Sequence, residues 1–125
     1  MTNILNLLNS DAVINFVNLT PHDIKIIVDG EEVVIASSGV IARLKSEVRK
    51  IGFLTSGNGV KIPITQTFFG EIEGLPEEKE DTTYVVSTLV AQEGAKIGRH
   101  DLLAPGQQIR NEQGLVIGCE SLGIV

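Results

Sequence analysis

The chain is poor in the residue types that most often carry chemistry. It has one cysteine, two histidines and no tryptophan in 125 residues. Because Cys119 stands alone, no disulfide can form within the chain, and a reducing compartment is expected. Neither His22 nor His100 has another histidine or a cysteine at the spacing of a zinc site, so we expect no metal and no cofactor.

Concentrated positive charge is also missing. The formal net charge is −6, and the ten lysine and arginine residues are spread along the chain without forming a basic stripe. We therefore expect neither duplex DNA nor long RNA as a partner. A small anion is a different case, because two or three converging arginines can hold a phosphate whatever the net charge of the protein.

Membrane and export signals are absent from the start of the sequence. The first basic residue is Lys25, and Asp11 and several asparagines interrupt the early apolar residues. A secretory signal needs a basic start and a continuous apolar segment, and a membrane span needs a longer apolar run. We expect neither of them, and no membrane partner.

The familiar catalytic signatures do not occur either. The sequence has no GxGxxG, GxxxxGK[ST], HExxH, GxSxG or CxxC motif. Ser87, His22 and Asp101 contain the side chains of a serine-hydrolase triad, but nearly any chain contains such a set and the signal is very weak. These absences favour a binding protein over an enzyme and leave the enzyme question open.

Short runs of valine, isoleucine and leucine dominate what is present, and they are typical of strands. The clearest pattern is a hairpin, "IKIIV" and "EEVVIA", joined at Asp29-Gly30, a dipeptide suited to a tight primed turn. Further strands are predicted at 13–19, 40–45, 47–54, 60–69, 83–92 and 115–119. A short helix is predicted between 91 and 103, and one or two amphipathic turns within 1–11.

This spacing predicts a mainly β protein. We expect a short N-terminal amphipathic segment over 1–12 and a single β-rich domain over 13–125, with seven or eight short strands and at most one or two short helices. A small β-barrel or sandwich-like fold is the expected architecture, because closure removes exposed strand edges.

The stretch "NLTPHD" places four polar side chains around a proline, between two apolar runs. Pro21 pushes Thr20 toward an extended conformation, and Asn18 and Thr20 can bond to nearby backbone, so a tight connecting turn is one interpretation. The other is a functional site, because His22 and Asp23 lie at a strand end and histidine transfers protons near neutral pH.

Two later clusters are also candidates. Thr65, Phe69 and Glu71 lie on an extended segment, where an outward phenylalanine can stack on a nucleobase or pack against a second subunit. Arg99 and Asp101 flank His100 in a loop-like segment, and arginine recognises phosphate bidentately. The alternative interpretation of the first cluster is an exposed acidic strand. The alternative interpretation of the second cluster is a set of surface salt bridges.

A resemblance adds a biological setting. The blocks "NLTPHDI", "SSGVIAR", "TFFGEIEGLPE", "YVVSTLVAQ", "HDLLAPG" and "GLVIGC" occur in this order between about Asn15 and Cys119. In this order they resemble a family of small uncharacterised bacteriophage and prophage proteins with an Asn-Leu-Thr-Pro-His opening motif. The resemblance carries no established activity and implies a phage setting. Small phage proteins without enzyme signatures are often antagonists of host defence, for example by sequestering a nucleotide messenger of host immunity, so we expect such a role in the cytoplasm of the host bacterium.

Three hypotheses follow. The first is a phage counter-defence protein that binds and sequesters a small nucleotide-derived immune signal without cleaving it, most simply as a homo-oligomer. The second is an enzyme that hydrolyses a cyclic nucleotide signal with His22, assisted by Asp23 or Glu71. The third is a protein-interaction or structural module. The expected ligand-binding residues are Asn18, Thr20, His22, Arg43, Thr65, Phe69, Ser87, Arg99, Asp101 and Arg110.

Overall fold

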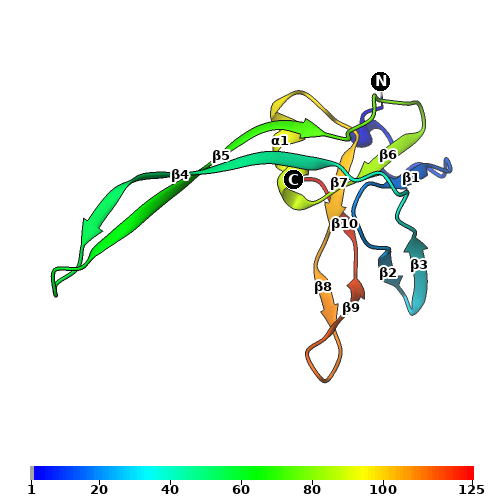
Figure 1. Cartoon of the computed structure of the whole chain (residues 1–125). Coiled ribbons are helices and arrows are strands. Elements are labelled where there is room, and N and C mark those ends of the chain that lie inside the picture. Colours follow the sequence, from blue (N-terminus) through cyan, green and yellow to red (C-terminus); the bar gives the residue numbers. More distant parts are fainter. Residues whose placement is uncertain (1) are drawn as a thin grey trace.

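Residues 2–125 are described in a computed structural model of the chain, in which strands form three separate sheets (Figure 1). The first sheet has the order β1-β6-β7-β10, the second β3-β2-β9-β8, and the third consists of β4 and β5. The strands are β1 (Asn15–Asn18), β2 (Ile24–Val28), β3 (Glu31–Ile35), β4 (Arg43–Thr55), β5 (Lys61–Glu73), β6 (Thr82–Val85), β7 (Leu102–Pro105), β8 (Gln108–Arg110), β9 (Val116–Cys119) and β10 (Leu122–Gly123).

The first sheet carries the larger part of the core. Strands β1 and β7 both run parallel to the central strand β6, and β10 runs antiparallel to β7. The helix α1 (Thr88–Lys96) forms the crossover that a parallel β6–β7 pair requires. Its buried residues pack with those of β6 and β7 in a cluster of Leu19, Ala42, Tyr84, Val86, Val90, Ala91, Leu102 and Ala104.

The second sheet is built from two hairpins that extend from the body in the same direction (Figure 1). Asp29 and Gly30 both have positive φ angles, +49° and +81°, as a primed turn between β2 and β3 requires. A smaller cluster lies beneath this sheet and contains Ile24, Ile26, Ile35 and Cys119. Val85 of β6 packs into the same cluster, so β6 connects the two parts of the core.

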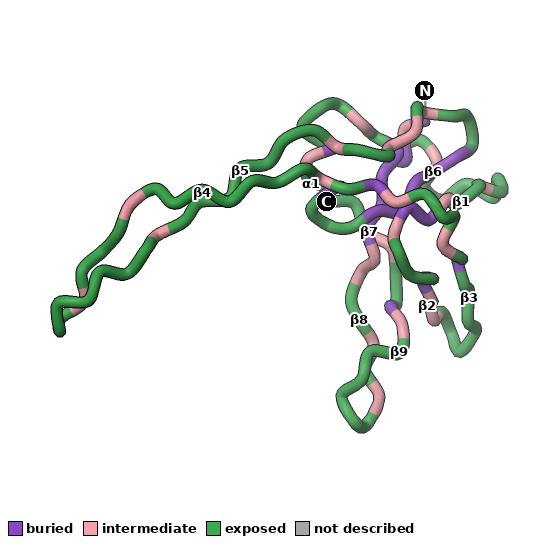
Figure 2. Tube along the Cα trace, viewed as in Figure 1, coloured by how far each residue is buried: buried purple, intermediate pink, exposed green. Residues whose placement is uncertain are grey.

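The third sheet is a two-stranded ribbon that projects away from the body (Figure 1). Strands β4 and β5 have 13 residues each and join through a turn around Gly57 and Gly59. Two irregularities interrupt their register, one near Lys45 and one near Ile51. Figure 2 shows the ribbon exposed along most of its length, while the buried residues gather in the body.

The root of the ribbon is held by a close backbone approach. Gly74, directly after β5, has a φ of +78°, a conformation that side chains with a Cβ rarely adopt. A Cβ placed on Gly74 would also lie only 2.3 Å from the carbonyl oxygen of Ile41. Glycine at this position therefore lets the end of β5 pack against the segment that leads into β4.

The prediction of a mainly β protein with few helices is confirmed. Besides α1, the described residues contain a short 3₁₀ helix, η1 (Ile4–Asn6), in the region expected to be amphipathic. No helix within residues 2–125 is long and apolar enough to cross a membrane. The hairpin at Asp29-Gly30 is also confirmed.

Other predicted details were wrong. The strands within residues 2–125 do not close into a barrel, because β4 and β5 pair only with each other, and a sandwich is not confirmed either. The strand expected at 83–92 ends at Val85, since the Ser87 side chain accepts a bond from the Val90 amide and starts α1. The strand predicted over 13–19 is limited to β1, Asn15–Asn18; Val13, before it, is 93% exposed, and Phe16 within it is 42% exposed.

Candidate functional site

The NLTPHD segment is organised by the buried side chain of Asn18. Its Nδ2 atom donates to the carbonyl oxygens of His22 and Ile35, at 2.8 and 2.9 Å. Its Oδ1 atom accepts from the amide of Thr20 at 2.9 Å, and the Thr20 hydroxyl lies 2.7 Å away. All four hydrogen-bonding positions of this amide are thus used within the chain.

The same segment connects to the residues that lead into the ribbon. The Ser37 amide donates to Asp23 Oδ1 at 2.8 Å, and the Ser37 hydroxyl donates to the Thr20 carbonyl oxygen at 2.7 Å. The Ala42 amide donates to the Leu19 carbonyl oxygen, one residue before β4 begins. These contacts show that NLTPHD forms a connecting turn. His22 is an exposed residue of this turn.

Arg99 and Asp101 lie together at the start of β7. The guanidinium donates to both carboxylate oxygens of Asp101, at 3.0 and 2.9 Å, and to the Pro76 carbonyl oxygen at 2.9 Å. Glu78 lies 3.6 Å from the same group. The hydrogen bonds that Arg99 donates to Asp101 raise the pKa of Arg99 despite its partial burial. Because Asp101 is fully buried, this cluster ties the 76–81 loop to the body.

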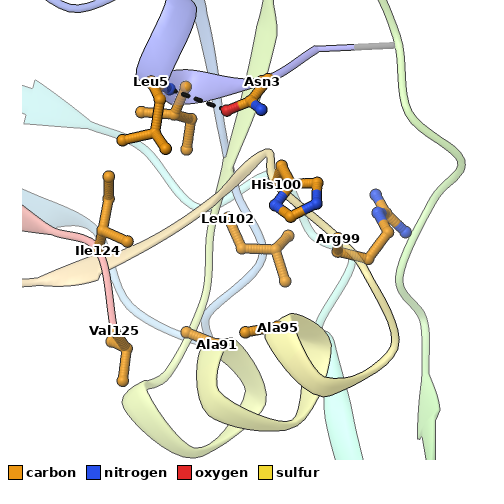
Figure 3. A pocket seen from close by; sticks show the side chains of 10 residues that line it. Asn3, Leu5, Ala91, Ala95, Arg99, His100, Leu102, Ile124 and Val125 are labelled. Atoms are coloured by element: carbon orange, nitrogen blue, oxygen red, sulfur yellow. Dashed lines mark hydrogen bonds between the residues drawn. The ribbon is translucent and has the colours of Figure 1, made fainter.

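A small pocket lies next to this cluster (Figure 3). Its volume is about 150 Å³, below the ~300–1,000 Å³ of ordinary small-molecule sites. His100 and Leu102 border the space, but the guanidinium of Arg99 points toward the neighbouring loop, where it binds Pro76 (Figure 3). This pocket is mostly apolar and offers no free arginine to an anion.

The remaining predicted residues are dispersed. Ser87 caps α1, and Arg110 donates to the Gly114 carbonyl oxygen at 2.8 Å within the β8–β9 hairpin. Arg43 lies at the root of the ribbon, in register with Glu73. Thr65 lies near the middle of the ribbon opposite Lys50. The ten expected ligand-binding residues therefore do not form one pocket around His22.

The ribbon itself carries the best candidate site. A hollow of about 390 Å³ lies near its root and is lined by Lys45, Ser46, Glu47, Arg49, Phe68, Phe69 and Gly70. This volume falls within the ~300–1,000 Å³ range of small-molecule sites. Phe68 lies opposite Glu47 and Phe69 opposite Ser46 in the register, so the ring of Phe68 shares a face of the ribbon with Glu47 and Arg49, whereas Phe69 points to the other face.

The charged side chains that line this hollow give it a net positive charge, and the hollow is open to solvent. Two cations and one carboxylate line it, and the Arg49 guanidinium lies 4.7 Å from the centre of the Phe68 ring. Glu47 accepts from Arg49 at 2.8 Å and raises the pKa of the guanidinium. Lys45 lies 3.2 Å from Glu73. Both pairs are more than half exposed, so each is weak and can be exchanged for another partner.

A second hollow of about 390 Å³ shares Gly70 with the first and lies between the ribbon root and α1. Glu71 and Arg99 both line it, together with Glu93 and Ile97. The structure therefore brings the predicted residues Glu71 and Arg99 to one place, while His22 belongs to the separate NLTPHD turn. Phe69 is the one expected ligand-binding residue that lines the ribbon hollow.

Sequence reasoning missed Lys45 and Arg49 as partners of the two phenylalanines. The signal was present, because a hairpin turn at "SGNG" folds 43–55 back on 61–73 and brings Arg49 opposite Gln66, beside Phe68. The two register irregularities could not be read from the sequence. They decide which face each cation occupies.

Comparisons with known proteins add no relative. No model of a known protein family matches the chain, and no curated protein or solved structure matches it. Within residues 2–125, no group of three or more His, Cys, Asp or Glu side chains is placed to hold a metal ion. The chemistry of the ribbon hollow is therefore the basis for a functional proposal.

Proposed function

We propose that the protein binds a small nucleotide-derived signal in the ribbon hollow and holds it without cleaving it, as a phage counter-defence protein. The observation that carries this proposal is the grouping of Lys45 and Arg49 with the exposed ring of Phe68. The phage setting rests on the resemblance of the six sequence blocks, and the ligand class rests on the hollow.

The chemistry of these groups fits a nucleotide. A base stacked on Phe68 would contribute ~1–3 kcal/mol, and the planar guanidinium of Arg49 can donate two parallel hydrogen bonds to a phosphate. Lys45 would add a point charge. A phosphate would replace the exposed carboxylate partners of these cations at little cost, because exposed ion pairs are weak.

Retention followed by chromatography tests the proposal. The purified protein is incubated with cyclic di- and trinucleotides and with cyclic ADP-ribose variants, and unbound ligand is removed by filtration. We expect one of these molecules to stay with the protein and to be recovered intact after heat denaturation. If none is retained, the binding proposal fails.

The same experiment separates binding from hydrolysis. New products in the heated sample would overturn sequestration without cleavage and favour a hydrolase. His22→Ala would then be compared with the wild type. Unchanged turnover would remove His22 from the reaction, because a proton-transfer group typically contributes ~10²–10⁴-fold to the rate.

A further inference from the structure

The distal half of the ribbon exposes an unusual amount of apolar surface. Val48, Ile51, Phe53, Leu54, Val60 and Ile62 are 48–66% exposed there. A two-stranded ribbon has no interior in which to bury such side chains, and it is marginally stable by itself. Exposed apolar surface of this kind marks an interaction site.

The body carries an apolar groove of about 500 Å³. Side chains from η1, β1, β2, β7 and β10 line it, including Leu8, Phe16, Val28 and Ile124, which are 42–56% exposed. Glu120 belongs to the same lining, and Asp29 follows Val28 in the chain. The groove is therefore apolar within and bordered by acidic residues.

The charges of the two regions are opposite. Residues 43–73, the ribbon, hold five of the ten basic residues but only three of the sixteen acidic ones, which gives a net charge of +2. The whole chain has −6, so the rest of the molecule carries −8. Two ribbons would repel each other, whereas a ribbon and a body attract.

A ribbon cannot fill the groove of its own chain, because it extends away from the body (Figure 1). We propose that the distal half of the ribbon of one copy docks in the apolar groove of a second copy, and that the second copy returns the same contact. This arrangement has two-fold symmetry, so each contact occurs twice in the dimer. Lys50 and Lys61 would then lie near the acidic border of the partner's groove.

The apolar ribbon residues proposed to dock are not among those that line the ribbon hollow, so self-association does not require the proposed ligand. The test therefore uses protein without any ligand. Sedimentation and native mass spectrometry at micromolar concentration should give twice the 13.4 kDa mass of the chain. A monomer under these conditions would overturn the proposal.

Two variants and their mixture identify the contact. Leu54→Glu places a negative charge on the ribbon, and Phe16→Lys places a positive charge in the groove. We expect each variant alone to weaken dimerisation at least about tenfold, as central apolar contacts do. Mixed together, they should form a heterodimer, because the intact ribbon of one chain meets the intact groove of the other.

The matched control is Val34→Glu, which changes a side chain of 54% exposure on β3, opposite Lys25 and on the face of the sheet away from the groove residue Ile26. It should dimerise as the wild type does. Circular dichroism and thermal unfolding check that all variants fold, which is expected because each replaced side chain is exposed. A dimer that survives Leu54→Glu, or a mixture without heterodimer, would refute docking of the ribbon in the groove.

Discussion

At the residue scale, Asp101 is the most consequential polar group in the body. Its buried carboxylate accepts two bonds from Arg99, and the same guanidinium reaches Pro76 and Glu78 on the 76–81 loop. Sequence reasoning assigned Arg99 and Asp101 to a ligand. Their mutual contacts also give them a structural role that does not need one.

Replacing Asp101 tests this role. Asp101→Asn removes the charge that Arg99 binds, so we expect the free energy of unfolding to fall by ~3 kcal/mol, as when a buried pair loses one partner. Urea denaturation measures the change. The control is Glu93→Gln, which removes the Lys96 pair on α1 and should cost ~0–1 kcal/mol because that lysine is exposed. Equal effects of the two substitutions would contradict the assigned role.

Tyr84 gives a prediction about pH. Burial raises its pKa, and the nearby Asp101 carboxylate adds to this effect. The unfolded chain releases the phenol proton near pH ~10, before the folded chain does. Stability should therefore be unaffected by this group below that pH and should fall as the pH rises through the higher folded pKa.

The measurement of this effect is direct, because Tyr84 is the only tyrosine in the chain. Ultraviolet titration of the folded protein reports its ionisation alone. Tyr84→Phe should remove the additional alkaline loss of stability, although it also removes the bond to the Glu77 carbonyl oxygen, worth ~1 kcal/mol. An identical alkaline slope in both proteins would refute the assignment.

At the element scale, local patterns predicted local structure well. The hairpin at Asp29-Gly30 and the two strands flanking "SGNG" were recognised because their turn residues lie between β-rich runs. The parallel pairing of β1 with β6 was not predicted, because no local pattern specifies a partner more than sixty residues away. The apolar run at 83–92 contains both the end of β6 and the start of α1. The helix cap Ser87 lies between them, and the apolar pattern alone does not reveal it.

The candidate site shows the same division. An outward ring in the Phe68–Phe69 pair was predicted from the alternation of its own strand, whereas the cationic neighbours of Phe68 depend on cross-strand register. The NLTPHD segment was predicted correctly as a turn. Its bonds to the 37–42 segment, which lead into the ribbon, arise only from tertiary packing.

The root of the ribbon provides a prediction at this scale. Gly74 and Gly30 have nearly equal φ angles, +78° and +81°, but only a Cβ at Gly74 would meet another atom, the Ile41 carbonyl oxygen. Gly30→Ala should therefore cost ~1–2 kcal/mol from backbone strain alone. Gly74→Ala should cost distinctly more in urea denaturation. Equal losses would show that the close approach at the ribbon root is unimportant.

At the scale of the whole molecule, charge and apolar surface are both divided between two regions. The ribbon is basic with exposed apolar residues, and the body is acidic with an apolar groove. The ribbon hollow lies near the junction of the two, where the ribbon leaves the body. This arrangement places a cationic, aromatic surface on a molecule that is acidic overall.

Calorimetric titration of the cyclic nucleotide panel into matched variants tests the central claim most directly. The wild type should bind at least one member, and Phe68→Ala should weaken that binding by about ten- to a hundredfold, as expected for one lost stacking contact. Lys45→Gln should weaken it less. Lys25→Gln removes a comparable exposed pair with Glu32 on the β2–β3 hairpin and should change nothing. Failure of the wild type to bind any member, or equal affinity of Phe68→Ala and wild type, would contradict the ribbon hollow as a nucleotide site.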